Sequence, residues 1–305
     1  MFRHDCAALL IAAALPFTQP DLVAAQPASP DAFAGTGTLR FADVQLRTGV
    51  RLRYAEQGDP HGEAVILLHG LTDSWFSFSR ILPLLPSSLH VFALDQRGQG
   101  DSDQPASGYT MADLGDDVLA FMDTMRLREA TIVGHSMGSF VAQRVAVTAP
   151  ERVRRLVLLG SATTGNNDMV RAVKEEVASL PESMPRAFLH DFQYSTIHAP
   201  VPDVFMNRAI DESAKVPSRV AGALLDGLLA SGDSARLAGI RVPTLIIRGE
   251  HDAIFPRSES LRLRESIAGS ELRMYPDVGH AAHWEVPEQV VRDLLSFFER
   301  RGVRD

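Results

Sequence analysis

Five short apolar runs, each followed by turn residues, constrain the fold of this 305-residue chain more than any other feature. Each run is apolar at consecutive positions, which is typical of strands buried on both faces of a mainly parallel sheet. They are Ala64–Leu68, Val91–Leu94, Thr131–Val133, Leu156–Leu159 and Thr244–Ile247. Helical patterns separate them, and alternation of strand and helix predicts an α/β doubly wound sheet.

Three further segments bring the predicted sheet to about eight strands. Gly37–Leu46 and Val50–Gln57 alternate apolar and polar residues on either side of a Thr-Gly turn, which predicts a hairpin, and Glu271–Met274 predicts a last strand. The helices expected around the sheet are Met111–Met125, Ser139–Ala149, Ser258–Ile267 and Pro287–Arg300.

One interval interrupts the alternation of strands and helices. From about Thr163 to Ala238 there is no comparable strand run, whereas Met169–Leu180 and Ser218–Ala230 have helical spacing. We therefore predict a helical cap at 163–238, inserted between the two parts of the core at 37–162 and 239–305.

The first 25 residues match a secretory signal peptide. A basic start precedes the apolar Cys6–Phe17, and small residues end at Val23-Ala24-Ala25. The apolar run is shorter than the roughly 18 residues that span a bilayer, so no stable membrane anchor is expected. We predict a signal peptide at 1–25, a linker at 26–36, and export to a periplasm or out of the cell.

Composition excludes several classes of function. Cys6 is the only cysteine and would leave with the signal peptide, which excludes cysteine catalysis and cysteine-ligated zinc. The formal net charge of −8 argues against a nucleic-acid partner, which normally requires a basic face. No nucleotide, metal or flavin motif is found, so no cofactor is predicted.

The segment Gly134–Gly138 matches the pattern G-x-S-x-G, with Ser136 at its centre. A predicted buried strand precedes it and a predicted helix follows, as a nucleophile elbow requires. Such a turn lifts the serine hydroxyl out of the sheet and directs the first helical amides at a developing oxyanion. We predict that Ser136 is a nucleophile.

Two backbone amides are candidates for the oxyanion hole. The residue after an elbow nucleophile supplies one N–H, and the loop after an earlier strand supplies the other. The candidates are Met137 and Leu71, which follows the pair His69-Gly70. His69 itself is expected to bond loop backbone.

A serine hydroxyl needs a base, and that base needs an acid to orient it. Among ten histidines, His280 follows the last predicted strand and is preferred to His283. Asp252 follows the strand Thr244–Ile247 and is preferred to Glu250. A metal site at His280 and His283 is disfavoured, since no nearby carboxylate or thiolate completes a ligand set.

These residues resemble the α/β-hydrolase superfamily, in its capped esterase, epoxide-hydrolase-like and cofactor-free haloperoxidase-like branch. The order Ser136, Asp252, His280 fits, and Asp95–Ser102 is similar to the D-x-R-G-x-G-x-S turn of that branch. Relatives with aspartate at the elbow form an ester on that carboxylate, whereas this chain has Ser136. The resemblance covers about Gly37 to Val303 and implies acyl transfer through a serine.

The expected function is hydrolysis of a carboxylic ester or lactone through an acyl-enzyme on Ser136. The substrate is expected to be a small molecule with an apolar acyl or alcohol part, since the predicted cap carries apolar side chains: Phe188, Phe192, Tyr194, Phe205 and Met206. Two alternatives use the same triad: cleavage of a C–C bond in a β-diketone-like substrate, and cofactor-free oxygenation or perhydrolysis. Fold analogy does not choose among them, and the oligomeric state is left open.

Overall fold

The computed structural model of the protein describes residues 38–232 and 234–299. The predicted signal peptide and linker lie outside the described residues. Among the described helices, none combines the length and hydrophobicity needed to cross a bilayer.

Eight strands form one sheet in the order β1-β2-β4-β3-β5-β6-β7-β8. β2 pairs antiparallel with β1 and with β4, and every other pair is parallel. The predicted mostly parallel sheet is therefore confirmed. The strands are β1 Arg40–Gln45, β2 Arg51–Gly58, β3 Glu63–Leu68, β4 Leu89–Leu94, β5 Ala130–His135, β6 Val153–Leu159, β7 Thr244–Gly249 and β8 Glu271–Tyr275.

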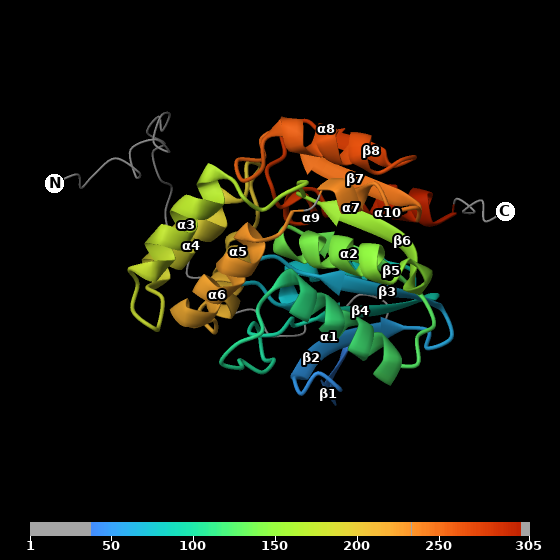
Figure 1. Ribbon diagram of the computed structural model, residues 1–305, viewed down its shortest axis with the longest axis horizontal. Helices are drawn as coiled ribbons and strands as arrows, with labels where there is room; N and C mark the ends of the chain where they lie inside the picture. The colour runs from blue at the N-terminus through green and yellow to red at the C-terminus, as the bar shows by residue number, and fades with distance from the viewer. Residues whose placement is uncertain (1–37, 233, 300–305) are drawn as a thin grey trace, which may run out of the picture. The chain divides into compact units, whose positions relative to one another are not determined.

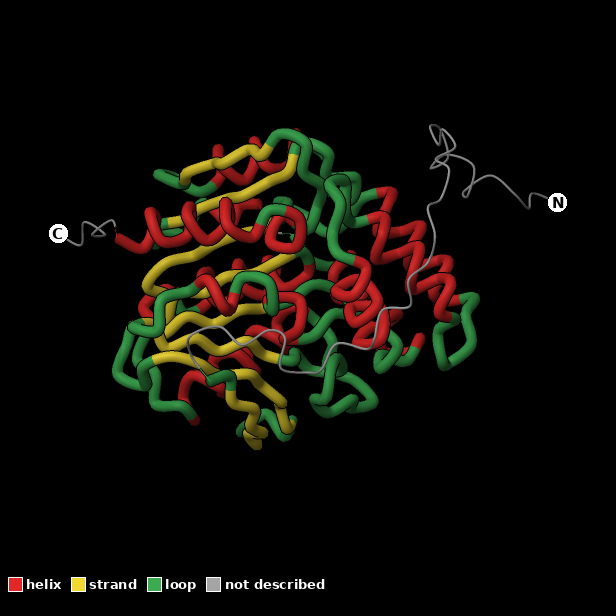
Figure 2. Tube along the Cα trace, turned by 180° about the vertical axis from the view of Figure 1, so that it is seen from behind, coloured by secondary structure: helices red, strands yellow, loops and turns green. Residues whose placement is uncertain are grey.

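Helices cover both faces of the sheet, and the strands supply apolar side chains to each face. In β3, Ile66 and Leu68 belong to the core cluster that includes side chains of α1 (Met111–Thr124) and α2 (Met137–Thr148). Val65 and Leu67 belong to the cluster that includes side chains of α10 (Pro287–Glu299). Successive strand side chains point to opposite faces, so consecutive apolar residues are needed here. Figure 1 shows α1 and α2 in front of the sheet, and Figure 2, seen from behind, shows α10 on the opposite face.

The core helices are α1 Met111–Thr124, α2 Met137–Thr148, α8 Arg257–Ser266, α9 Ala282–Glu285 and α10 Pro287–Glu299. Short 3-10 turns occupy Trp75–Phe78, Leu82–Leu84 and Pro150–Arg152. The Thr110 hydroxyl accepts from the Asp113 amide while the Asp113 carboxylate accepts from the Thr110 amide, and this reciprocal cap begins α1.

Within the described residues, five helices lie between β6 and β7 in the chain. They are α3 Asp168–Ala178, α4 Arg186–Ser195, α5 Asp203–Ser213, α6 Ser218–Leu229 and α7 Ser234–Leu237. Figure 1 shows α3 to α6 gathered together beside the sheet. The cap boundaries at 163 and 238 stay a prediction.

Candidate active site

Ser136 occupies the turn between β5 and α2, with φ of 50° and ψ of −123°. A positive φ is rare for a residue with a side chain and costs about 1–3 kcal/mol. The Ser136 amide donates to the Leu159 carbonyl of β6 at 3.0 Å, which anchors the turn to the sheet. The strand, the strained turn and the helix predicted for an elbow are all present.

The two glycines of this turn allow backbone segments to pass closer than any side chain permits. A Cβ on Gly138 would lie 2.3 Å from the Leu68 carbonyl oxygen, and one on Gly134 would lie 2.4 Å from the Gly138 carbonyl oxygen. Ser139 fixes the start of α2 by donating to the Ser136 carbonyl at 2.5 Å. The sequence pattern thus reflects packing of the elbow against β3 as well as the position of Ser136.

His280 and Asp252 form a buried pair at the ends of β8 and β7. His280 Nδ1 lies 2.9 Å from Asp252 Oδ2, while Asp252 Oδ1 accepts the amides of Ile254 and Phe255. Burial alone raises the pKa of Asp252, but His280 and the hydrogen bonds outweigh it and hold that pKa below its usual range. The carboxylate is therefore ionised and orients the imidazole.

The other nitrogen of His280, Nε2, is buried and has no hydrogen-bond partner within the described part of the chain. His280 and Ser136 line the same pocket. Gly160 lies against this imidazole, since a Cβ there would come within 2.8 Å of Nδ1. No acid side chain fits at that position, whereas Asp252 reaches the imidazole from β7.

The other residues considered for the base or the acid have different surroundings. His283 Nε2 is 3.1 Å from the Ser77 hydroxyl, and Glu250 is exposed. His69 Nε2 accepts the Gln96 amide at 3.0 Å, and its Nδ1 is 2.8 Å from the Gly70 carbonyl. Burial lowers the pKa of His69 to about 4 and that of His283 to about 3, so both are neutral.

Leu71 and Met137 are the two candidate oxyanion donors. Met137 is the first residue of α2, where amides have no partner inside the helix. Leu71 follows β3 and lines the pocket with Ser136. In the described turns and loops, neither amide donates to another backbone carbonyl.

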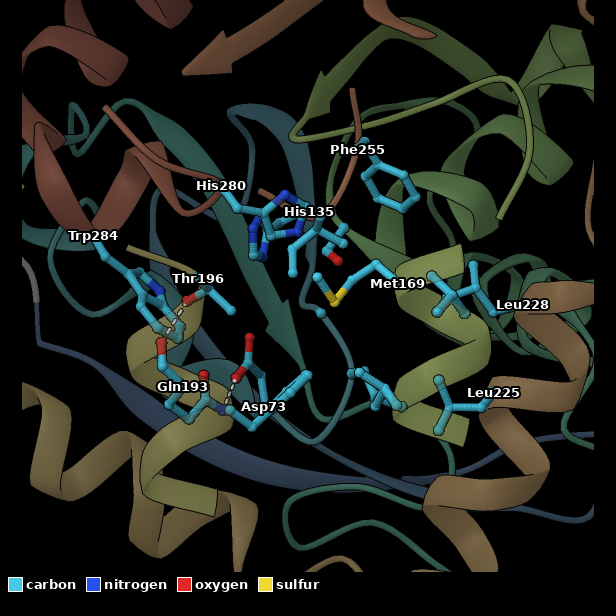
Figure 3. A pocket seen from close by; sticks show the side chains of 17 residues that line it. Asp73, His135, Met169, Gln193, Thr196, Leu225, Leu228, Phe255, His280 and Trp284 are labelled. Carbon is cyan, nitrogen blue, oxygen red and sulfur yellow. Dashed lines mark hydrogen bonds between the residues drawn. The ribbon is translucent and has the colours of Figure 1, made fainter. Parts of the chain in front are cut away.

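The pocket beside Ser136 is mainly apolar (Figure 3). Helices α3, α4 and α6 contribute Met169, Val170, Val173, Phe192, Leu225 and Leu228, and the core contributes Leu71, Ile254, Phe255 and Trp284. Of the apolar cap residues singled out in the sequence, only Phe192 lines it. Phe205 and Met206 instead belong to a buried cluster with Phe76 and Trp284.

Among the described residues, Asp73 is the one carboxylate side chain that lines the pocket, and sequence reasoning missed it. Asp73 lines the pocket and accepts from Gln193 Nε2 at 3.0 Å (Figure 3). It also accepts from the Ser77 hydroxyl at 3.2 Å. Burial raises the pKa of Asp73 to about 6, although its hydrogen bonds oppose this. Among the described residues, no lysine or arginine lines the pocket. The one sequence signal for Asp73 as a site residue is its position two residues after Leu71, the candidate oxyanion donor.

Two other buried carboxylates hold the loops of the site. Glu285 accepts the amides of Gly279, His198 and Ala199 at 2.6–2.9 Å. Asp95 accepts the Trp75 amide at 2.7 Å and the Asp101 amide at 2.8 Å. Both carboxylates therefore fix the geometry of the loops around the site.

A model of the alpha/beta hydrolase fold matches residues 63–287 of this chain, which therefore belongs to that family. It is similar to a 2-hydroxy-6-oxononadienedioate/2-hydroxy-6-oxononatrienedioate hydrolase of Escherichia coli, at 29% identity over 86% of this chain and 96% of the relative.

Similar solved structures include an esterase from Exiguobacterium antarcticum, with a TM-score of 0.77 and 24% identity over 85% of this chain and 99% of that one. An enol-lactonase from Burkholderia xenovorans LB400 also has a TM-score of 0.77, with 22% identity over 85% of this chain and 100% of that one. The family and these relatives support hydrolase activity, and the structural likeness shows the fold.

Proposed function

We propose that the protein hydrolyses uncharged carboxylic esters or lactones through an acyl-enzyme on Ser136. The observation that carries this proposal is the set of groups around Ser136. They are a base oriented by an ionised acid, two backbone amides that make no bond to another backbone carbonyl in the described turns and loops, and an apolar pocket whose described lining holds no lysine or arginine.

The geometry supports a reaction in two halves. Ser136 Oγ attacks the carbonyl carbon while His280 Nε2 takes its proton, and the amides of Leu71 and Met137 hold the oxyanion. The imidazolium, stabilised by Asp252, then protonates the leaving alcohol. Water repeats the sequence with His280 as base, releases the acid and restores the Ser136 hydroxyl.

The charge of the pocket favours esters over the substrate of the Escherichia coli relative. A dioate carries two carboxylates, and burying one without a cation is costly. Here the acidic group in the pocket is Asp73, which repels an anion once it ionises. An uncharged ester or lactone with an apolar part avoids both the burial of an unpaired carboxylate and repulsion by Asp73.

Cleavage of a C–C bond is the second candidate. The observation in its favour is the similarity to the dioate hydrolase, which extends over 96% of that relative. The same serine, base and oxyanion donors would serve it, so the substrate decides between the two reactions.

Matched substrates test the proposal. We would measure kcat/KM for 4-nitrophenyl esters of increasing acyl length, and for a pair whose acyl chain ends in a methyl ester or in a free carboxylate. The expected result is at least a tenfold preference for the uncharged member, about 1.4 kcal/mol in the transition state. Ser136→Ala should lose most of this activity, on the order of 10³-fold or more.

Faster turnover of 2-hydroxy-6-oxononadienedioate than of any ester would overturn the ester assignment and establish the second candidate. Equal rates for the unchanged protein and Ser136→Ala would overturn the serine mechanism for both.

Export remains part of the proposal, supported by the basic, apolar and small-residue order of Met1–Ala25. Expression in a bacterial host with amino-terminal sequencing tests it. A mature chain that begins at Gln26 is expected, and an uncleaved cytoplasmic product contradicts it.

A further inference from the structure

Two histidines and an aspartate meet on the surface outside the pocket. His198, His251 and Asp277 are all exposed, and one ligand atom from each lies within 4.8 Å of the others. The imidazole rings of His198 and His251 stack at 3.8 Å with 7° between their planes. His251 Nε2 is 3.8 Å from Asp277 Oδ1.

These residues come from three separate segments. His198 lies between α4 and α5, His251 follows β7 immediately before Asp252, and Asp277 follows β8 three residues before His280. The cluster therefore joins the cap interval of the chain to the two loops that carry the acid and the base.

The backbone holds the three segments together without any ion. The His251 amide donates to the Val278 carbonyl at 2.9 Å. The His198 amide donates to Glu285 Oε2 at 2.9 Å, and the same carboxylate accepts the Gly279 amide. The backbones of His198 and His251 are thus both tied to the loop of Asp277, which lowers the entropy lost when their side chains bind one ligand.

Two imidazoles and a carboxylate form a donor set suited to a borderline divalent cation. Zinc(II) takes nitrogen and oxygen ligands in a tetrahedron, and three protein ligands leave one position for water. Parallel rings do not converge on one point, so a ring must turn when an ion binds. The His251 side chain is 48% exposed and that of Asp277 is 91% exposed, which leaves them room to move.

We propose that His198, His251 and Asp277 bind one zinc-like divalent cation, which fastens the segment between α4 and α5 to the loops of Asp252 and His280. The site is separate from the pocket, and no step of ester hydrolysis passes through it. It does not depend on the proposed function, because the binding is measured directly.

Calorimetric titration of the full chain with zinc chloride, on protein made without a polyhistidine tag, tests the proposal. One zinc per chain is expected. Thermal unfolding should shift upward by about 5 °C when zinc is one-hundredfold above its Kd. The double variant His198→Ala/His251→Ala should lose the binding and the shift.

Two single variants complete the design. Asp277→Asn should weaken zinc at least about tenfold while it keeps the turn, because asparagine tolerates the positive φ of 55° found there. His190→Ala is the matched control, since His190 is exposed and lies 3.0 Å from a carboxylate, that of Asp191. It should bind zinc like the unchanged chain. Equal zinc affinity in the double variant and the unchanged chain overturns the proposal, as does the absence of zinc binding to the unchanged chain.

Discussion

The backbone of Ser136 is held in a conformation that a residue with a Cβ rarely adopts. Strain of this kind costs about 1–3 kcal/mol in a residue with a side chain, whereas glycine is unstrained there. Glycine in turn lowers the free energy of unfolding by about 0.5–1 kcal/mol, because it makes the unfolded chain more flexible. Ser136→Gly should therefore unfold with a free energy about 1 kcal/mol higher than Ser136→Ala, as measured by urea denaturation. A Ser136→Ala protein of equal or greater stability would show that the turn is unstrained.

In the proposed mechanism, Asp252 acts through His280 rather than on the substrate. Asp252→Asn preserves the acceptor for the amides of Ile254 and Phe255 but presents an amide nitrogen to His280 Nδ1, which favours the wrong tautomer. We expect kcat to fall by about 10³–10⁴ with KM little changed. Glu250→Gln, two residues away and exposed, is the control and should keep full activity. A similar loss in both variants would refute the assignment of the acid.

At the residue scale, the positions of Ser136, Asp252 and His280 could be predicted from the sequence. Each follows a predicted strand, and the ends of parallel strands meet at one edge of a sheet. Asp73 and Gln193 are 120 positions apart and belong to no motif, so their contact appears only after the helices between β6 and β7 have packed.

Trp284 joins elements that lie far apart in the chain. This α9 side chain is 1% exposed, packs edge-on against Phe205 of α5 at 5.3 Å, and donates to the Ser77 carbonyl at 2.9 Å. Trp284→Ala should lower the free energy of unfolding by about 3–5 kcal/mol, because it leaves a cavity and an unpaired carbonyl. Trp284→Phe keeps a ring against Phe205 and should lose less than half as much. Urea unfolding measures both, and a change below 1 kcal/mol in the alanine variant would contradict this packing.

Helices α4 and α5 show why some elements escaped prediction. Each begins after a proline, Pro185 or Pro202, and neither has a side chain that caps its first amides. Proline is compatible with the first turn of a helix, yet a proline-rich stretch without capping residues is also typical of turns. α3, with Asn167 accepting the Val170 amide as its cap, was predicted almost to its ends.

The pH dependence of stability belongs to the whole molecule, because buried groups of opposite sign oppose one another. Burial lowers the pKa of His69, His135 and His283, so between pH 4 and 6 these groups bind protons only when the chain unfolds, and stability falls as pH falls. Burial raises the pKa of Asp73 to about 6 and that of Asp95 to about 7, which works in the other direction.

On unfolding, the three histidines take up protons and the two aspartates release them, which leaves a net uptake of one proton. These groups should therefore lower the free energy of unfolding by about 1 kcal/mol for each pH unit from pH 6 down to pH 4. Asp73→Asn removes one opposing group, and its slope should be about twice as steep. Urea unfolding at several pH values measures both slopes. Parallel slopes for the two proteins would show that Asp73 is ionised throughout this range.

For the molecule as a whole, the sequence predicted all eight strands but not their order. A buried strand is recognisable from its own residues, since both faces must be apolar. Placing β4 between β2 and β3 depends on a crossover and on pairings such as Tyr54 with Leu94, forty positions away, which no local pattern encodes.

Covalent labelling shows directly whether Ser136 is the nucleophile. The protein would be treated with diethyl 4-nitrophenyl phosphate, which transfers its phosphoryl group to an activated serine hydroxyl, and its mass and peptides would be measured. One diethylphosphoryl group per chain is expected, on the peptide that contains Ser136. Esterase activity should be lost in proportion to labelling, and Ser136→Ala and His280→Ala should take up no label. A label on another residue, or undiminished labelling of Ser136→Ala, would contradict Ser136 as the nucleophile.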